Sequence, residues 1–179
     1  MYPVHLVGKK IILREFRPDD VDGAFRIVGD PRVTDWLSFD TRTRDQAADM
    51  VAGIVARAQE DLRTEYYLAV TKQDSSDLIG FGRLGLSGVK AAKLGFAITA
   101  DEWGHGFATD AARTLTDFGF RELDLHRVSA AIGPKNVASM ALVTKLGFLP
   151  EGRIRDHVFT NGAWRDSILY SVLKHEWPH

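Results

Sequence analysis

The amino-acid sequence predicts one α+β domain that spans residues 1–179. Segments typical of strands alternate along the chain with segments typical of helices, and polar turns join several of them. The chain contains no internal repeat, low-complexity stretch or linker that would separate two units. Its length is sufficient for one substantial core and short for two.

The first part of the chain predicts a strand followed by two helices. Apolar residues within Leu6–Phe16 indicate the strand. Asp19 or Asp20 is placed to cap a helix that runs to about Val28. The segment Thr43–Leu62 is polar but carries apolar residues at helical spacing, so a second helix is expected there.

The middle of the chain predicts a hairpin and a further strand. Tyr66–Val70 and Leu78–Leu86 are apolar runs on either side of the polar turn Gln73–Asp77. A third apolar run ends near Ile98.

A glycine turn follows that strand. Trp103–Ala111 contains two glycines spaced by one residue, and an apolar stripe from Phe107 to Leu123 indicates that the turn opens a helix. Backbone N–H groups at a helix start lack intrahelical partners and carry the positive end of the helix dipole. The turn therefore predicts a phosphate-binding site, with a plain connecting turn as the alternative.

The last part of the chain predicts a strand, a helix and a terminal hairpin. Asn136 is suited to cap the helix, and Gly147 to end it. Asn161-Gly162 is a typical hairpin turn. The expected elements are Val128–Ile132, Val137–Leu146, and Phe148–Phe159 with Trp164–Leu173.

A second glycine pattern, Gly80–Gly85, fits the G-x-G-x-x-G form of dinucleotide-binding proteins. In a dinucleotide-binding site, a helix begins directly at the glycines. The segment Leu86–Val89 contains another glycine and no apolar residues at helical spacing, so it does not predict such a helix. We therefore expect these glycines to mark close packing or a bulge within a strand.

Composition excludes several classes of chemistry. The chain has no cysteine, so disulfides, thiolate nucleophiles and sulfur-ligated metals are ruled out. Its formal net charge of −1 gives no basic excess for nucleic acid. No stretch is apolar enough to span a membrane, and the first residues do not resemble a signal peptide, so a cytoplasmic protein is expected.

Taken together, the motifs resemble the GNAT superfamily of N-acetyltransferases over nearly the whole chain. Within it they are most similar to the RimJ/RimL-like branch of ribosomal-protein N-terminal acetyltransferases and its small-molecule-acting relatives. The order and spacing of the pieces carry the resemblance. These pieces are Leu6–Arg14, Leu78–Gly80, Leu94–Phe96, Trp103–Thr109, Asn136 with Ser139, Lys145–Phe148 and Glu151-Gly152.

The resemblance implies an α+β fold with a mixed, mostly antiparallel sheet of six to seven strands, splayed at its centre and flanked by about four helices. Acetyl-CoA would lie in the splay as co-substrate, and no metal is implied. The residues implied to bind it are Phe96, Ala97, Ile98, Gly104, His105, Gly106, Phe107, Ala108, Thr109, Asn136 and Ser139.

The resemblance also implies direct attack of a neutral amine on the thioester. The backbone N–H of Ile98 would stabilise the oxyanion. Val143 stands where many relatives have a tyrosine acid, which leaves Ser139 as the nearby hydroxyl and candidate acid. Because a thiol has a pKa of about 8.5, the leaving thiolate needs little help, and loss of Ser139 is expected to slow turnover rather than abolish it.

The general base is not fixed by the resemblance. Lys93 and Val158 occupy the two positions where relatives often carry an acidic residue. Asp156 shares strand parity with Val158 and is the candidate base, whereas His157 would face away unless the strand bulges. Asp166 and solvent remain alternatives.

The acceptor side is expected in the segment Val33–Phe39 and the following helix. Asp35, Trp36 and Asp40 suggest a pocket for a cationic amine with an aromatic wall, with plain packing of Trp36 as the alternative. Relatives often carry acidic residues at the positions of Lys93 and Val158, and this chain does not. A small amine acceptor, such as an antibiotic or metabolite, is therefore at least as compatible with the sequence as a protein N-terminus.

Two other functions stay open. The fold could use another acyl donor or an aminoacyl-tRNA, although the neutral charge does not support nucleic-acid binding. A CoA-binding module with weak or no catalysis is the other alternative, because the acidic residues that act as general bases in relatives are replaced by Lys93 and Val158. A homodimer is compatible with the resemblance.

Overall fold

The computed structural model describes residues 1–178. Its α-helices are α1 (Val21–Val28), α2 (Pro31–Thr34), α3 (Arg44–Ala58), α4 (Phe107–Arg121) and α5 (Val137–Lys145). Its strands are β1 (His5–Val7), β2 (Ile11–Glu15), β3 (Glu65–Lys72), β4 (Leu78–Leu86), β5 (Ala91–Ile98), β6 (Arg127–Ile132), β7 (Leu149–Thr160) and β8 (Ala163–Leu173).

The strands form one sheet in the order β1-β2-β3-β4-β5-β6-β8-β7. Only β5 and β6 pair in parallel, and every other neighbouring pair is antiparallel. The mixed α+β fold is as predicted, but the sheet has 8 strands rather than six to seven. The difference arises at the N-terminus, where a turn splits the predicted strand Leu6–Phe16 into β1 and β2.

That turn is held by a helix on one face of the sheet. Gly8 N–H donates to the Ile11 carbonyl at 2.8 Å. The Asp110 carboxylate of α4 accepts from the backbone N–H groups of Lys10 at 2.7 Å and Ile11 at 3.3 Å. A buried carboxylate thus fixes the turn against the start of α4, which places Lys10 close to the predicted glycine turn.

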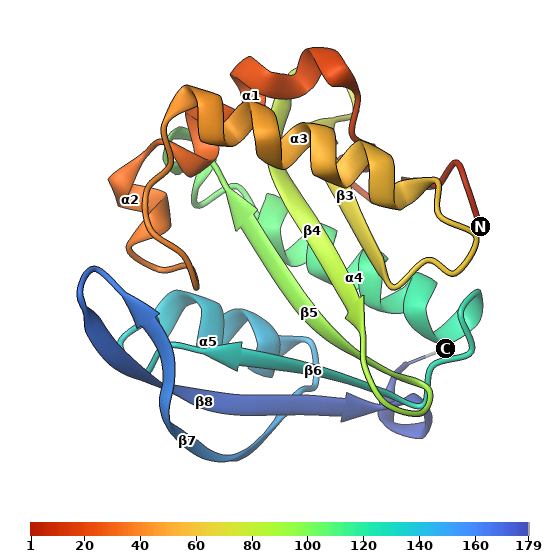
Figure 1. Ribbon diagram of the computed structural model, residues 1–179. Coiled ribbons are helices and arrows are strands. Elements are labelled where there is room, and N and C mark those ends of the chain that lie inside the picture. The colour runs from red at the N-terminus through yellow and green to blue at the C-terminus, as the bar shows by residue number, and fades with distance from the viewer. Residues whose placement is uncertain (179) are drawn as a thin grey trace.

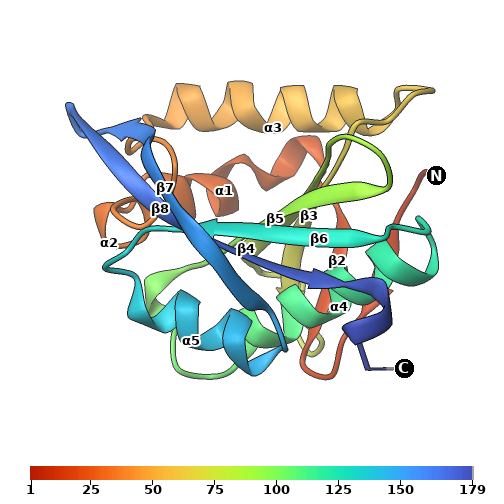
Figure 2. The ribbon, with the colours of Figure 1, turned by 90° about the horizontal axis from the view of Figure 1, so that it is seen from below.

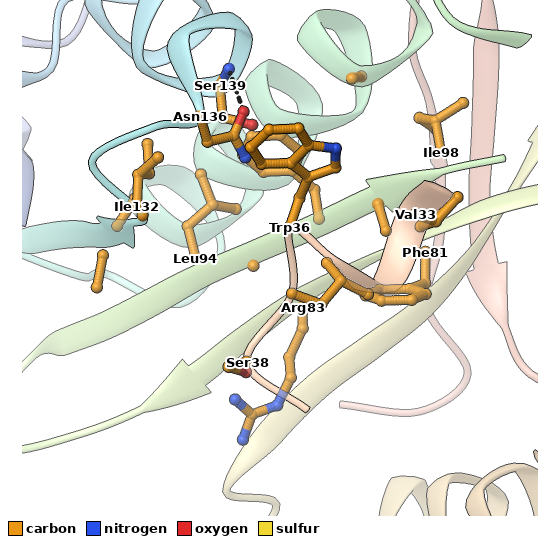
Figure 3. Close-up of a pocket in the computed structure, with 18 of the residues that line it drawn as sticks. Val33, Trp36, Ser38, Phe81, Arg83, Leu94, Ile98, Ile132, Asn136 and Ser139 are labelled. Atoms are coloured by element: carbon orange, nitrogen blue, oxygen red, sulfur yellow. Dashed lines mark hydrogen bonds between the residues drawn. The ribbon is translucent and has the colours of Figure 1, made fainter. Parts of the chain in front are cut away.

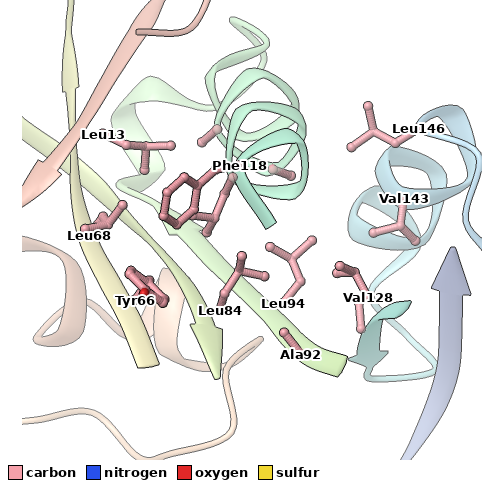
Figure 4. Close-up of a cluster of buried hydrophobic side chains, with 14 of the residues drawn as sticks. Leu13, Tyr66, Leu68, Leu84, Ala92, Leu94, Phe118, Val128, Val143 and Leu146 are labelled. Atoms are coloured by element: carbon pink, nitrogen blue, oxygen red, sulfur yellow. The ribbon is translucent and has the colours of Figure 1, made fainter. Parts of the chain in front are cut away.

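Helices cover both faces of the sheet (Figures 1 and 2). α1 and α3 lie on one face, and α4 and α5 on the other. The helix count exceeds the expected four because α2 is a short additional helix of 4 residues. On the α3 face, the core includes Ile27, Val51, Ile54, Ala69 and Phe81. On the α4 face, the core includes Leu13, Leu68, Leu84, Phe118 and Val143 (Figure 4). Leu115 belongs to the same cluster.

The helix expected over Thr43–Leu62 is confirmed as α3, which ends earlier, at Ala58, and the Asn161-Gly162 hairpin turn is confirmed as well. Thr43 caps α3, with its hydroxyl accepting from the Gln46 N–H and the Gln46 side chain accepting from the Thr43 N–H. Asn161 and Gly162 join β7 to β8 with φ of 51° and 73°, which is the left-handed geometry of a tight hairpin turn. Asp20, by contrast, directs its side chain to the Arg17 N–H and to Arg14 instead of capping α1.

The sheet opens between its two parallel strands. β5 and β6 are paired only through Ala91–Lys93 and Arg127–Ser129. Beyond Lys93, β5 continues on β4 and β6 continues on β8, so the two strands diverge (Figure 1). The resulting V-shaped splay is the feature that positions the candidate site.

The stretch Gly80–Gly85 lies inside β4 and forms no nucleotide-binding turn. A Cβ built on Gly80 would come within 2.3 Å of the Ala97 carbonyl oxygen and 2.6 Å of the Ile98 Cδ1 atom. The backbones of β4 and β5 can therefore lie this close only with glycine at this position.

We predict that Gly80→Ala lowers the free energy of unfolding by about 1–3 kcal/mol, because the added methyl group must displace backbone. Gly95→Ala is the matched control, since a Cβ on Gly95 meets nothing within 4 Å. Urea denaturation measures both. Equal midpoints for the two variants would contradict the close packing of β4 on β5.

Candidate active site

The splay opens into a cavity of about 1780 Å³. Its walls come from β5 and β6, the starts of α4 and α5, the segment after α2, and the β7–β8 hairpin. Asn136 and Ser139 lie at one end in Figure 3, and Arg83 and Ser38 at the other.

The glycine turn before α4 presents free backbone donors to this cavity. The first hydrogen bond of α4 runs from the Asp110 N–H to the Gly106 carbonyl at 3.1 Å. Among residues 1–178, no acceptor pairs with the N–H groups from Gly104 to Thr109. Gly104 and Gly106 have φ of 81° and 80°, a left-handed conformation that glycine adopts without strain.

Positive charge is added to this turn from a distant part of the chain. The Lys10 ammonium donates to the His105 carbonyl at 2.9 Å and lies 3.4 Å from the Cβ position of Gly106. Together with the helix dipole, it makes the turn suited to a phosphate group. The His105 ring does not line the cavity, and its Nδ1 atom lies 3.1 Å from the Glu102 carbonyl instead.

The edge of β5 offers a second set of unpaired backbone groups. Hydrogen bonds from Ser87 N–H to Ala91 O and from Thr99 N–H to Ile79 O bracket an unbroken register with β4. In an antiparallel pair, hydrogen-bonded positions alternate. Odd-numbered residues of β5 therefore bond to β4, and the N–H and C=O groups of Phe96 and Ile98 point into the splay.

One of these edge groups is already satisfied. The Trp103 indole N–H donates to the Ile98 carbonyl at 2.8 Å. The Ile98 N–H and both backbone groups of Phe96 remain available. Buried backbone groups of this kind are normally paired, so the edge is suited to an extended ligand that carries amide groups.

The start of α5 lies across the splay from β5. The Asn136 side-chain oxygen accepts from the Ser139 N–H at 3.1 Å and caps the helix, as predicted. Asn136, Ser139, Lys135 and Lys145 all line the cavity. This end of the cavity combines a capped helix start, a hydroxyl and two cations.

A bulge in β7 decides which side chains reach the other end of the cavity. Ile154 pairs with Ser167 and Val158 with Arg165, so the register shifts between these two pairs. Asp156, within this bulge, has a φ of 47°. The simple alternation that placed Asp156 and Val158 on one face is therefore broken.

The bulge turns His157 into the cavity and Asp156 away from it. His157 lines the cavity, and its Nδ1 atom lies 2.9 Å from the hydroxyl of the buried Ser167. Asp156 instead borders a shallow surface hollow together with Asp166. The backbone hydrogen bond from Asp156 and the side-chain bond from Arg153 hold the pKa of Asp166 below its usual value.

The β7–β8 hairpin is tied to the segment that follows α2. Arg165 donates to the carbonyl oxygens of Leu37 at 2.8 Å and Asp35 at 3.3 Å. The Asn161 N–H donates to the Asp40 carboxylate at 2.8 Å. Trp36 lines the cavity and is 45% exposed, whereas the Asp35 side chain does not line it.

A buried carboxylate that the sequence analysis did not single out organises the α3 side. Glu65 accepts from the Nε atoms of Arg57 at 2.8 Å and Arg83 at 2.6 Å. Burial alone would raise the pKa of Glu65, but the bonds from the two guanidinium groups outweigh it and hold the pKa below its usual value. Strand parity could have signalled the pair, since Glu65 and Arg83 lie on one face of adjacent strands.

Arg127 is neutralised in a similar way at the vertex of the splay. It makes two bonds to the Glu151 carboxylate, at 2.7 and 2.5 Å, and the Ser171 hydroxyl donates to the same carboxylate at 2.6 Å. The bonds from Arg127 and then Ser171 lower the pKa of Glu151 to about 2. Arg127 therefore adds little net charge to the cavity.

The turn from Gly104 to Thr109, which we call the glycine cradle, and the unpaired edge of β5 lie in one cleft and are suited to a ligand with a pyrophosphate and an amide-bearing arm. Coenzyme A has both groups. Such a site on this fold is that of an acyl-CoA-dependent transferase. None of the described helices is long and apolar enough to cross a membrane, and the described residues contain no group of His, Cys, Asp and Glu that could hold a metal ion.

Comparison with known proteins gives the family. A family model described as an acetyltransferase (GNAT) domain matches residues 10–149. The uncharacterized N-acetyltransferase p20 of Bacillus licheniformis is 30% identical over 174 residues, which cover 96% of this chain and 97% of that protein. The chain therefore belongs to the GNAT family of N-acetyltransferases, which use acetyl-CoA.

Two further matches lie in the predicted branch. The alanine N-acetyltransferase of ribosomal protein uS5 from Escherichia coli is 28% identical over 115 residues, covering 63% of this chain and 59% of that one. The solved structure of Mycobacterium smegmatis RimJ in complex with CoA-disulfide has a TM-score of 0.87 at 22% identity, covering 99% of this chain and 91% of that one. At 22% identity, the match to the RimJ structure shows a shared fold.

We predict that Glu65→Gln lowers the free energy of unfolding by about 1–2 kcal/mol at neutral pH, because two guanidinium groups lose their shared anion. The folded-state pKa of Glu65 lies below its unfolded value of 4.5, so its stabilising effect is present above pH 4.5 and is lost as pH falls. Urea denaturation from pH 7 to below pH 4 should show the wild-type advantage shrinking on the acid side. An advantage that is constant across this range would contradict the prediction.

Proposed function

We propose that the protein transfers the acetyl group of acetyl-CoA to a primary amine that enters from the α3 side of the sheet. The observation that carries this is the meeting, in one cavity, of the glycine cradle, the free edge of β5 and a histidine on the opposite wall. The first two suit the donor. The third suits removal of a proton from the acceptor.

The residues proposed to hold acetyl-CoA fall into three groups. The backbone N–H groups from Gly104 to Thr109, with Lys10 beside them, would hold the pyrophosphate. The free backbone groups of Phe96 would bond to the pantetheine arm, the Ile98 N–H would donate to the oxyanion, and Ala97 would support both through its bonds to β4. The amide of Asn136 has donors left for the same arm, since capping uses only its oxygen.

Ser139 is proposed as the acid that protonates the leaving thiolate. Its half-buried side chain lines the cavity at the start of α5, and no described residue accepts from its hydroxyl. A serine hydroxyl is a weak acid, and a thiolate is a good leaving group. The contribution of Ser139 is therefore orientation and a modest acceleration.

His157 is proposed as the general base in place of Asp156. The Ser167 hydroxyl fixes its Nδ1 atom, which leaves Nε2 to accept the proton from the incoming ammonium. The amine nitrogen then bonds to the acetyl carbon, and the carbon–sulfur bond breaks. The products are an amide, the CoA thiol and one proton that passes from His157 to solvent.

A thiol-release assay with acetyl-CoA and a panel of amines tests the proposed function. The panel should hold small amines, amino acids and short peptides with free amino termini. We expect turnover with at least one amine and a mass gain of one acetyl group on that amine. Binding of acetyl-CoA without acetylation of any amine would instead favour a binding module.

His157→Gln is expected to lower kcat/KM by about 100-fold or more, because general bases typically contribute a factor of this size. The affinity for CoA should be unchanged, because His157 lies on the wall opposite the groups proposed to hold CoA. Asp156→Asn is the matched control, because Asp156 directly precedes His157 in the sequence but lies outside the cavity. A large loss in the Asp156 variant with little loss in the His157 variant would reverse the assignment.

A further inference from the structure

The α3-side wall of the cavity carries more positive charge than its own carboxylates neutralise. We call this the acceptor wall and define it by the lining cations Arg42, Arg57, Arg83, Lys93 and Arg165. The carboxylates that border it or bond to it are Asp40, Asp49 and Glu65.

The pair of arginines on Glu65 retains a net positive charge. One carboxylate is shared by Arg57 and Arg83, and each bonds to it through Nε. The terminal nitrogens of Arg83 have no acceptor among residues 1–178, and its side chain is 43% exposed. One guanidinium charge is thus left to act on whatever occupies the cavity.

Lys93 adds a second uncompensated charge at the vertex of the splay. It is exposed and pairs with Ser129, at the last position where β5 and β6 are joined. No carboxylate within residues 1–178 forms an ion pair with it. Arg127 nearby is already paired with Glu151, and Asp40 is engaged by the Asn161 N–H.

Register brings Lys93 and Arg83 to one surface. Gly95 pairs with Arg83, and Lys93 lies two residues before Gly95 on the same face of β5. A Cβ built on Gly95 would meet nothing within 4 Å, so the surface between the two cations is open. An anionic group would find two cationic donors beside an unobstructed backbone here.

The aromatic part of the wall does not reverse this charge balance. The Arg42 guanidinium lies 4.4 Å from the centre of the Phe39 ring, so that face of the ring is already covered by a cation. The Asp35 side chain, expected from the sequence to attract a cationic amine, lies outside the cavity. A polycationic acceptor would therefore meet repulsion and few partners.

We propose that the acceptor is a primary amine that also carries a carboxylate, and that Lys93 and Arg83 bind this carboxylate as specificity-determining residues. The inference rests on the proposed acetyl transfer and adds the chemical class of the acceptor. Both an amino acid and the amino terminus of an acidic peptide have this chemistry. The amine end would be directed to His157, and the anionic end to the acceptor wall.

Acceptors that carry different charges provide the test. One series is 4-aminobutyrate, its neutral amide and spermidine. The other is a set of tetrapeptides with an N-terminal alanine and with glutamate, glutamine or lysine at the second and third positions. Thiol release gives kcat/KM for each, and the series that responds distinguishes a free amino acid from a peptide terminus.

We expect the acidic member of at least one series to exceed its neutral partner by about tenfold or more in kcat/KM, with the advantage shrinking as salt is added. Lys93→Glu should abolish or invert this preference while CoA binding is retained. Arg83→Gln should weaken it, and both variants can be checked for folding by thermal denaturation. Arg121→Gln, an exposed cation on α4 that is remote from the cavity, is the control and should keep the preference.

The outcomes that overturn the inference can be told apart. Equal or faster acetylation of the neutral or cationic members, or an unchanged preference in Lys93→Glu, would refute the acidic acceptor while leaving acetyl transfer intact. No acetylation in either series, with turnover of another amine of the wider panel, would refute only this inference, whereas acetyl-CoA binding with no acetylation of any amine in the series or the panel would refute the proposed function as well.

Discussion

The separation of β5 from β6 is the constraint on which the rest of the site depends. A strand inside a sheet normally has both edges paired, yet beyond Lys93 β5 is paired only with β4. Both backbone groups of Phe96 and the N–H of Ile98 face the splay and are therefore left for a ligand, whereas the Ile98 carbonyl is taken by the Trp103 indole. The sheet tolerates this opening because each half is secured separately, by β4 on one side and by β8 on the other.

The core on the α4 face spans both halves of the sheet and positions the glycine turn. α4 packs on the sheet through Leu115 and Phe118, so its N-terminus and the glycine turn are held at the mouth of the splay. Asp110 ties the same helix to the turn between β1 and β2, which brings the Lys10 ammonium to the carbonyl of His105 in the glycine turn. The bond between Lys10 and Asp110, which lie 100 residues apart in the sequence, thus brings the positive charge of Lys10 to the glycine turn.

The elements that local chemistry determines could be predicted from the sequence. The apolar stripe of α4, the glycine turn before it, the cap at Asn136 and the Asn161-Gly162 turn each depend on a few adjacent residues. The eighth strand could not be predicted, because the break between β1 and β2 depends on Asp110 from a distant helix.

The cavity wall formed by β7 and the α3 side was harder to predict, because its geometry also depends on contacts between residues that are distant in the sequence. Regular alternation along β7 would put the Asp156 and Val158 side chains on the same face of the sheet. Because the strand bulges between its pairs with Ser167 and Arg165, the His157 side chain lines the cavity and that of Asp156 does not. The bulge is a register shift against β8, and the Asp156 N–H within it donates to the Asp166 carboxylate of that strand, so the β7 sequence alone does not determine it. Strand parity signals the contact between Glu65 and Arg83 only in combination with the register of β3 on β4, which the separate strand sequences do not give.

Native mass spectrometry of the purified protein with and without acetyl-CoA tests the central claim, that the splay and the glycine turn together bind CoA. We expect one CoA per chain, and loss of binding in Gly106→Val, whose side chain would sit on the cradle in a strained backbone conformation. Gly162→Val, at a left-handed glycine in the distant hairpin turn, should strain the chain comparably and still bind. Absence of CoA binding in the folded wild-type protein, or equal binding by the Gly106 variant, would contradict this account.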